Sequence, residues 1–319
     1  MAGSILVTGA AGFVGGHLLD RLLVEHSSIV GWYRPGLREP RPRPGVHWAP
    51  VELLDREAVS RAVADIRPSA VYHLAGAAHV GQSWQFTLET YQGNVLATHH
   101  LLNALRSVPG VRVLVTCSAT IYKPLDRPLR EADSLAPGSP YATSKLAQEM
   151  LAVRACEDDG MAVLIARAFN HTGPGQDPSF VAPGIARQIA RIEAGVQEPV
   201  LRVGNLEPKR DLTDVRDVVR AYVGMMARAV PGQPYNVCSG RQLTIRALVE
   251  AFVSRARTSI TLVQDASLFR PTDAPLLVGD HGRLSAATGW MPEIPLDKTV
   301  DDLLEHWRAH PTAQLELAK

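Results

Sequence analysis

Short apolar runs alternate with longer stretches of helical spacing along the first half of the chain. The run at 5–8 is apolar and β-prone and predicts a strand, while the stretch at 91–105 predicts a helix. Strands that alternate with helices form a parallel sheet, and ligands bind across the carboxyl ends of its strands. The pattern therefore predicts a doubly wound α/β fold of the Rossmann type. Its strands are expected at 5–8, 28–34, 46–51, 70–77 and 111–116.

The first predicted strand runs into the glycine-rich turn G-A-A-G-F-V-G at 9–15 and then into a helical pattern. This order of strand, turn and helix is the context in which such a motif binds a dinucleotide. Gly9 permits the tight turn, Gly12 lets a pyrophosphate approach the backbone, and Gly15 lets the helix pack closely on the strand. The helix N-terminus adds free N–H groups and a partial positive charge for the phosphates.

A second motif, Y-x-x-x-K, opens a long helix that is predicted to begin near residue 140. Ser139 and Pro140 suit a helix start, because a proline in the first turn sacrifices no hydrogen bond. Tyr141 and Lys145 are four residues apart, so their side chains leave the same face of the helix. An ammonium beside a phenol favours the phenolate, and we expect Lys145 to lower the pKa of Tyr141. The pair then predicts a proton donor and acceptor that works near neutral pH, and the alternative is an ordinary solvated pair.

The end of the second predicted strand bears on the choice of cofactor. NAD-binding folds place an Asp or Glu about 20 residues after the glycines, where it binds the ribose 2′-hydroxyl. Here the sequence has Tyr33 and Arg34 and no carboxylate, and an arginine can pair with a 2′-phosphate instead. The pattern favours NADP(H), with NAD(H) as the second option. Glu52 and Leu53 follow the strand at 46–51, where a loop is expected to contact the adenine.

Composition excludes several classes of function. The chain of 319 residues is 46% hydrophobic and 20% charged, which is typical of a globular protein. Its 33 basic and 32 acidic residues give a net charge of +1, so no nucleic-acid partner is expected. Cys117, Cys156 and Cys238 are unclustered, which indicates neither a disulfide framework nor a metal site. With no signal peptide and no apolar run of about 20 residues, the expectation is a cytoplasmic protein outside the membrane.

Four motifs, in this order, resemble the extended short-chain dehydrogenase/reductase family, which includes NAD-dependent epimerases and dehydratases. They are G-A-A-G-F-V-G at 9–15, H-L-A-G at 73–76, S-A-T-I-Y at 118–122 and Y-A-T-S-K at 141–145. The resemblance covers nearly the whole chain. It implies an NADP(H)-binding Rossmann domain over 1–170, and the chain returns to this domain over about 211–239. It also implies a smaller, discontinuous α/β domain for a nucleotide sugar over 171–210 and 240–319.

The resemblance further implies that Ser118, Tyr141 and Lys145 are the catalytic residues, with Thr120 beside them. Tyr141 would pass a proton to or from a sugar oxygen, Ser118 would hydrogen-bond that oxygen, and Lys145 would hold the cofactor's ribose. Small residues after the strand at 70–77 would let the cofactor lie against its end. The further cofactor contacts expected from the resemblance are Phe13, Ala75, Asn94 and Phe169.

Segments at 167–175, 203–217 and 270–280 resemble the branch of the family that handles GDP-mannose derivatives, closest to the GDP-4-keto-6-deoxy-D-mannose reductases. That resemblance implies that Arg210 and Arg270 clamp the diphosphate, a task suited to the planar guanidinium. The other substrate contacts that it implies are Asn170, His171 and Asp273.

Several activities share this scaffold. The dehydratases that resemble the chain carry a carboxylate one or two residues after the catalytic serine, where Ala119 and Thr120 stand here, so dehydration is disfavoured. The favoured activity is NADPH-dependent reduction of the C4 ketone of a nucleotide-linked 4-keto-6-deoxy sugar. The expected substrate is GDP-4-keto-6-deoxy-D-mannose, which would yield GDP-D-rhamnose or its C4 epimer.

Two other functions stay open. The S-A-T-I-Y string resembles NAD-dependent nucleotide-sugar 4-epimerases, and a non-catalytic NADP-binding regulator is the alternative from another class. Such regulators tend to lose the tyrosine or the lysine, and this chain keeps both. The family resemblance also implies a homodimer through a four-helix interface formed by the helices near 91–105 and 141–157.

Overall fold

The structure is a computed structural model that describes residues 4–36, 39–269 and 274–311. The described residues form a seven-stranded sheet in the order β11-β6-β5-β4-β1-β2-β3, and every neighbouring pair is parallel. The predicted doubly wound α/β fold is confirmed. Its strands are β1 (Ile5–Thr8), β2 (Ile29–Tyr33), β3 (Val46–Pro50), β4 (Ala70–His73), β5 (Arg112–Ser118), β6 (Ala162–Ala168) and β11 (Pro234–Val237).

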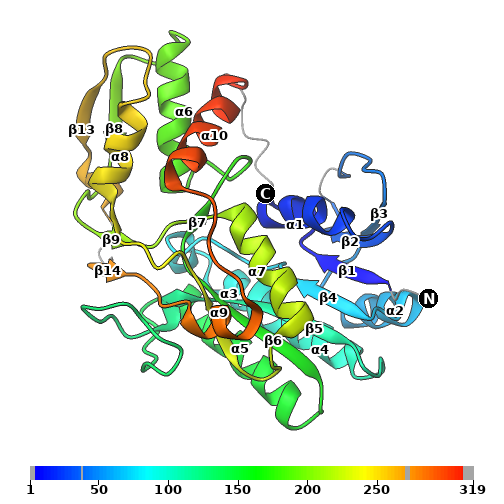
Figure 1. The fold of residues 1–319 in the computed structure, drawn as a ribbon. Helices are drawn as coiled ribbons and strands as arrows, with labels where there is room; N and C mark the ends of the chain where they lie inside the picture. The colour runs from blue at the N-terminus through cyan, green and yellow to red at the C-terminus, as the bar shows by residue number, and fades with distance from the viewer. Residues whose placement is uncertain (1–3, 37–38, 270–273, 312–319) are drawn as a thin grey trace.

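Helices cover both faces of this sheet (Figure 1). Ile5 and Val7 of β1 enter one core and Leu6 enters the other, because successive side chains of a strand point to opposite faces. Strands buried on both faces are apolar throughout, which is why the short runs were visible in the sequence. The first face carries α1 (Phe13–Leu23), α7 (Val215–Arg228) and α9 (Gly282–Thr288). The second carries α2 (Arg56–Ile66), α4 (Ala97–Leu105) and α5 (Pro140–Glu157), with α3 (Thr87–Tyr91) beside α5.

Some elements differ from the prediction. The helix expected at 91–105 begins earlier, as α3, and passes through a π-helical turn at Gln92–Leu96 before it continues as α4. The strand β6 was not predicted. The long helix predicted from about residue 140 is confirmed as α5, and the Ser139 hydroxyl caps it by accepting a hydrogen bond from Ala142 N at 3.1 Å.

A smaller unit lies beside the sheet (Figure 1). Its three helices enclose an apolar core of their own, which includes Ile185, Phe252 and Trp307. Its helices are α6 (Val181–Glu193), α8 (Ile245–Val253) and α10 (Leu296–Arg308). Its strands are β7 (His171–Thr172), β8 (Val200–Val203), β9 (Lys209–Arg210), β10 (Thr213–Asp214), β12 (Leu243–Thr244), β13 (Thr261–Gln264) and β14 (Leu276–Leu277).

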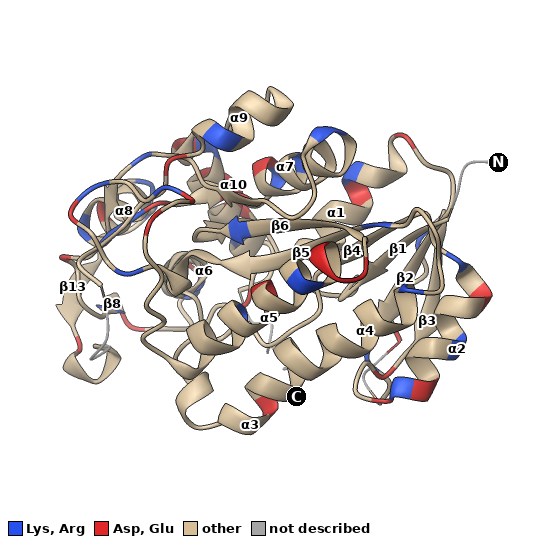
Figure 2. Cartoon of the chain, turned by 90° about the horizontal axis from the view of Figure 1, so that it is seen from below, with Lys and Arg blue, Asp and Glu red and all other residues tan. Residues whose placement is uncertain are grey.

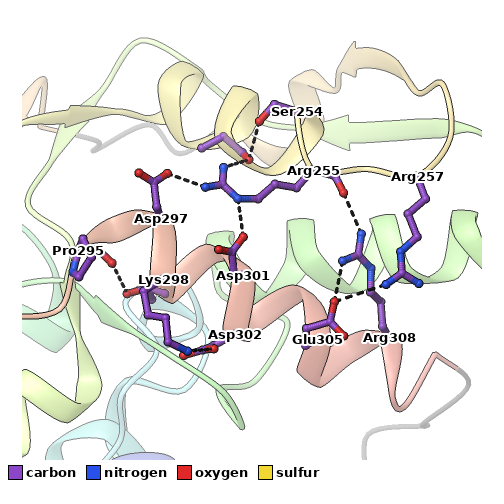
Figure 3. A network of polar contacts seen from close by, with 12 residues as sticks. Ser254, Arg255, Arg257, Pro295, Asp297, Lys298, Asp301, Asp302, Glu305 and Arg308 are labelled. Atoms are coloured by element: carbon purple, nitrogen blue, oxygen red, sulfur yellow. Dashed lines mark hydrogen bonds and ion pairs between the residues drawn. The ribbon is translucent and has the colours of Figure 1, made fainter.

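Ion pairs join the helices of this smaller unit (Figure 3). Arg255, just after α8, lies 2.6 Å from both Asp297 and Asp301 of α10. Arg308 of α10 donates to Glu193 of α6 and to the backbone oxygen of Arg255. A single surface ion pair contributes little to the stability of the fold, but this network connects all three helices. Two of these helices, α6 and α8, form one wall of the cleft described below.

A buried ion pair holds α5 on the sheet. The Arg167 guanidinium of β6 binds both carboxylate oxygens of Glu149, at 2.9 and 2.5 Å, and both side chains are almost fully buried. The same guanidinium donates to the Tyr122 hydroxyl at 2.7 Å, which donates to Asn236 of β11 at 2.7 Å. This network fixes the helix that carries Tyr141 and Lys145 relative to the ends of the strands.

Two negative observations concern only the residues that the structure describes. No helix among them combines the length and the apolar character needed to cross a membrane. In the same residues, no cluster of three or more histidine, cysteine, aspartate or glutamate side chains could hold a metal ion.

Candidate active site

A cavity of about 880 Å³ lies where the sheet meets the smaller unit. The sheet contributes the glycine-rich turn after β1, the end of β5 and the start of α5. The smaller unit contributes α6, α8, the end of β8 and the segment between β8 and β9. The strand order reverses between β1 and β4, and ligands of open α/β sheets bind at such a point.

The glycine-rich turn has the geometry of a phosphate cradle. Gly9 has a φ of 67°, and a Cβ there would lie 2.8 Å from the backbone nitrogen of Ala75. A Cβ on Gly15 would lie 2.3 Å from the carbonyl oxygen of Gly9, so only glycine lets α1 approach the turn this closely. No side chain caps α1, and its first turn contains no acidic residue. Its N-terminal N–H groups and Phe13 border the cavity, an arrangement that fits a dinucleotide diphosphate.

Ser118, Tyr141 and Lys145 meet at the same cavity. Ser118 ends β5, and its hydroxyl lies 3.0 Å from the Thr120 hydroxyl and accepts a hydrogen bond from Thr120 N. Tyr141 lies in the first turn of α5, and its backbone nitrogen donates to the Ser83 hydroxyl at 3.2 Å. The structure therefore brings together the four residues that were expected to be catalytic.

Protonation of the tyrosine differs from the expectation. Burial raises the pKa of Tyr141 to about 12, and a hydrogen bond with Ser118 opposes this only in part. The expectation that Lys145 lowers this pKa is wrong here, because the ammonium donates to Thr116 O at 3.0 Å and to Gln148 Oε1 at 2.9 Å. Its nitrogen lies 5.9 Å from the centre of the tyrosine ring. Tyr141 is thus fully protonated at neutral pH, in the form that a proton donor requires.

The pKa of Lys145 also departs from its usual value. Burial disfavours the ammonium and lowers the pKa of Lys145 to about 8. A fraction of this lysine is therefore neutral at mildly alkaline pH, and its charge changes within the range in which enzymes are assayed.

The residues expected at the adenosine end lie apart from this cavity. Arg34 follows β2, and its Nε lies 3.7 Å from a carboxylate oxygen of Glu52, which follows the neighbouring strand β3. Both side chains are partly exposed. The Leu53 carbonyl oxygen lies 3.0 Å from the Nδ1 of His100. The arginine was expected at this place, whereas the carboxylate of Glu52 beside it was not.

Three other expected cofactor contacts have distinct places. Asn94 is fully buried and binds both backbone groups of Ala77 and the hydroxyl of Ser144, so it holds the loop after β4 against α5. Ala75 donates its N–H to Thr8 Oγ1 at 3.3 Å. Phe169 is buried at the end of β6, and it borders the cavity together with Tyr141.

The structure describes three of the five residues that were expected to bind the substrate. Asn170, His171 and Arg210 border the cavity, and Arg210 donates to the carbonyl oxygen of Ala274 at 2.7 Å. Burial lowers the pKa of His171, whose ring stacks on Phe13 with the centroids 6.3 Å apart. Arg270 and Asp273, expected from the resemblance, lie outside the described residues.

Several lining residues were missed by the sequence analysis. The side-chain amide of Gln188 on α6 makes two hydrogen bonds with the backbone of Arg202 on β8. Phe180 stacks on His79 with the ring centroids 4.6 Å apart. These residues belong to no motif, and the packing of α6 against β8 places Gln188 and Arg202 together at the cavity.

The charges around the cavity have one sign. Lys145, Arg202 and Arg210 line it, whereas no aspartate or glutamate does so among the residues that the structure describes. The cavity therefore favours an anionic ligand and lacks a described carboxylate that could serve as a base.

A dinucleotide fold whose cleft unites a serine, a tyrosine and a lysine defines a cofactor-dependent oxidoreductase-like enzyme. Comparison with known proteins specifies the family further. The chain belongs to the GDP-mannose 4,6 dehydratase family, whose model matches residues 6–303.

A curated relative and two solved structures illustrate the match. The chain is 36% identical to a GDP-6-deoxy-D-mannose reductase of Pseudomonas aeruginosa, over 97% of this chain and 98% of the relative. A structure of RMD from P. aeruginosa complexed with NADPH has a TM-score of 0.85 and 35% identity, covering 96% and 99% of the two chains. A Thermus thermophilus UDP-glucose 4-epimerase in complex with NAD has a TM-score of 0.84 and 28% identity, covering 96% and 99%.

Proposed function

We propose that this protein reduces the C4 ketone of a nucleotide-linked 4-keto-6-deoxy sugar at the expense of NADPH. The proposed substrate is GDP-4-keto-6-deoxy-D-mannose, and the product is GDP-D-rhamnose or its C4 epimer. The single observation that carries the proposal is the lining of the cavity, which combines Tyr141 with three basic residues and has no described aspartate or glutamate. The similarity to a GDP-6-deoxy-D-mannose reductase supports the same substrate class.

This lining supports reduction over dehydration as the proposed reaction. Dehydration requires a group that removes a proton from C5, and a carboxylate is one side chain that can serve as that base. At the two places after Ser118, Ala119 is fully buried and Thr120 carries only a hydroxyl. Reduction needs only a proton donor at the ketone oxygen, and protonated Tyr141 meets that need.

The protein's residues have separate tasks in this reaction. When bound, NADPH supplies a hydride to the C4 carbon of the sugar. Tyr141 donates its proton to the C4 oxygen, so that the ketone becomes an alcohol and the tyrosine becomes a phenolate. Ser118 donates a hydrogen bond to the same oxygen and stabilises the negative charge that develops there. Arg210 and Arg202 bind the diphosphate of the nucleotide sugar.

The cofactor preference of this proposal depends on Arg34. We expect Arg34→Ala to weaken NADPH binding by about tenfold and to leave NADH binding unchanged, because only NADPH has a 2′-phosphate for the guanidinium to bind. Removing the nearby carboxylate, as in Glu52→Gln, should instead strengthen NADPH binding. Fluorescence titration of both cofactors measures these affinities, with the exposed Arg61→Ala as the control. An equal loss for both cofactors, or no loss for either, would reject this role of Arg34.

The reductase proposal is tested against an NAD-dependent 4-epimerase, the function that the S-A-T-I-Y segment at 118–122 favours. A reductase consumes one hydride in each turnover and must release its oxidised cofactor, whereas an epimerase returns the hydride to the sugar. We therefore expect purified protein to be largely free of nucleotide. Mixed with GDP-4-keto-6-deoxy-D-mannose, it should oxidise one NADPH for each sugar reduced. Absorbance at 340 nm and NMR of the product measure this ratio. Firmly bound NAD, with interconversion of saturated sugar nucleotides and no absorbance change, would contradict the proposal.

The proposal includes a homodimer that acts in the cytoplasm. Exposed apolar side chains gather on α3, the π-helical turn after it and α5, including Leu88, Leu96 and Met150. Figure 2 shows few charged residues along α3 and α4. Water-exposed apolar surface of this kind supports an interface between two copies of the chain.

A further inference from the structure

A chain of buried hydrogen bonds joins the end of β1 to Lys145. Thr8, His73, Thr98 and Gln148 are all fully buried, and Lys145 is nearly so. The contacts run from Thr8 Oγ1 to His73 Nδ1 at 2.8 Å and from His73 Nε2 to Thr98 Oγ1 at 2.9 Å. They continue from Gln148 Nε2 to Thr98 Oγ1 at 2.8 Å and from Lys145 Nζ to Gln148 Oε1 at 2.9 Å.

The donors in this chain can be assigned. The Thr98 hydroxyl donates to the carbonyl oxygen of Asn94 at 2.7 Å, so its oxygen accepts from both other partners. His73 therefore has its proton on Nε2 and accepts at Nδ1 from the Thr8 hydroxyl. Burial lowers the pKa of His73 to about 3, which keeps the ring neutral. Since Thr98 accepts from the amide nitrogen of Gln148, the amide oxygen is the atom that faces Lys145.

Gln148 lies one helical turn after Lys145, on the side of α5 that faces α4 and β5. It supplies one of two acceptors for the ammonium, and the other is the backbone oxygen of Thr116. Both acceptors are neutral. The ionisable groups around this lysine are Tyr141 on α5, Cys117 on β5, His73 on β4 and, farther away, the Glu149–Arg167 pair.

We propose that Gln148 is a positioning residue for Lys145, which holds the ammonium between the end of β5 and Tyr141 through an amide that Thr98 orients. This inference rests on the proposed function only in that Lys145 serves the reaction. A neutral acceptor orients the ammonium of Lys145 without adding a negative charge, which would raise the pKa of the lysine. The residues that form the chain belong to four elements, and Gln148 is its link to the active site.

Two substitutions at this position should move the pH dependence in opposite directions. Gln148→Glu places a carboxylate against the ammonium, raises the pKa of Lys145 and should shift the alkaline limb of kcat/KM upward by about one pH unit or more. Gln148→Met has a similar length but only a weak acceptor in its thioether, and should shift the limb downward and weaken cofactor binding several-fold. Gln197→Glu, a half-buried glutamine outside the cavity, is the matched control and should leave the limb in place. The proposal would be overturned if the alkaline limb of kcat/KM fell at the same pH in the unchanged protein and in all three variants. It would also be overturned if both Gln148 variants shifted the limb in the same direction.

A second measurement does not depend on catalysis. The pKa of Lys145 is about 8 in the folded protein and near 10.5 when unfolded, so the unfolded chain binds more protons in this window. The free energy of unfolding contributed by Lys145 therefore rises with pH from about 8 to 10.5. Gln148→Met lowers the folded pKa of Lys145 and should extend this rise to lower pH in the protein without cofactor. In the Lys145→Met background the difference should vanish. Urea unfolding between pH 7 and 10.5 measures all four combinations, and a difference that persists without Lys145 would reject the proposal even if no sugar is turned over.

Discussion

Replacing Tyr141 with phenylalanine is expected to lower kcat by about 10²–10⁴-fold in the reduction of the keto sugar. The ring stays in place at the start of α5, so the shape of the cavity is kept and only the proton donor is lost. Affinities for the sugar nucleotide and for NADPH should change little. Steady-state kinetics and binding titrations of the purified variant measure the two effects separately.

The matched control is Tyr235→Phe. The Tyr235 hydroxyl is buried away from the cavity and accepts a hydrogen bond from Val230 N at 3.0 Å. Its loss should reduce stability by about 1 kcal/mol and leave kcat nearly unchanged. If Tyr141→Phe kept nearly all of its activity, Tyr141 would not be the proton donor and the proposed mechanism would fail.

The largest expected effect on stability comes from Arg167→Met. This change leaves the Glu149 carboxylate buried on α5 without its bidentate partner, and breaking a buried pair in this way costs about 3–5 kcal/mol. The Tyr122 hydroxyl also loses a donor. The free energy of unfolding from urea denaturation measures the loss.

Arg61→Met provides the comparison, because Arg61 pairs with Glu57 on the exposed face of α2 at 3.6 Å. An exposed pair of this kind contributes only about 0–1 kcal/mol. Replacing both partners, as in Glu149→Gln with Arg167→Met, should recover part of the loss, because no unpaired charge then remains. Equal effects of Arg167→Met and Arg61→Met would show that the buried pair does not stabilise the fold.

The order of apolar runs was enough to predict the parallel sheet, because strands covered on both faces must be apolar along their whole length. The glycine-rich turn and the Tyr141–Lys145 spacing were equally readable, since a tight backbone approach and a four-residue helical repeat are local requirements. The strand β6 was missed although its sequence, AVLIARA, is an apolar run like those of the predicted strands and ends where polar, glycine and proline residues follow. The π-helical turn at Gln92–Leu96 was not predicted, because nothing in its residues excludes a regular helix.

The local sequence determined the fold class and the candidate catalytic residues. Long-range packing decided the pKa values and the hydrogen-bond partners of those residues. Tyr141 and Lys145 were expected to interact directly, whereas burial raises the pKa of the phenol and Gln148 and Thr116 bind the ammonium. The cationic lining that includes Arg202 also arises only when β8 and α6 pack beside the sheet. Desolvation and hydrogen-bond partners depend on residues far away in the chain, such as Thr98, 50 positions before Gln148, so they are settled by the tertiary structure alone.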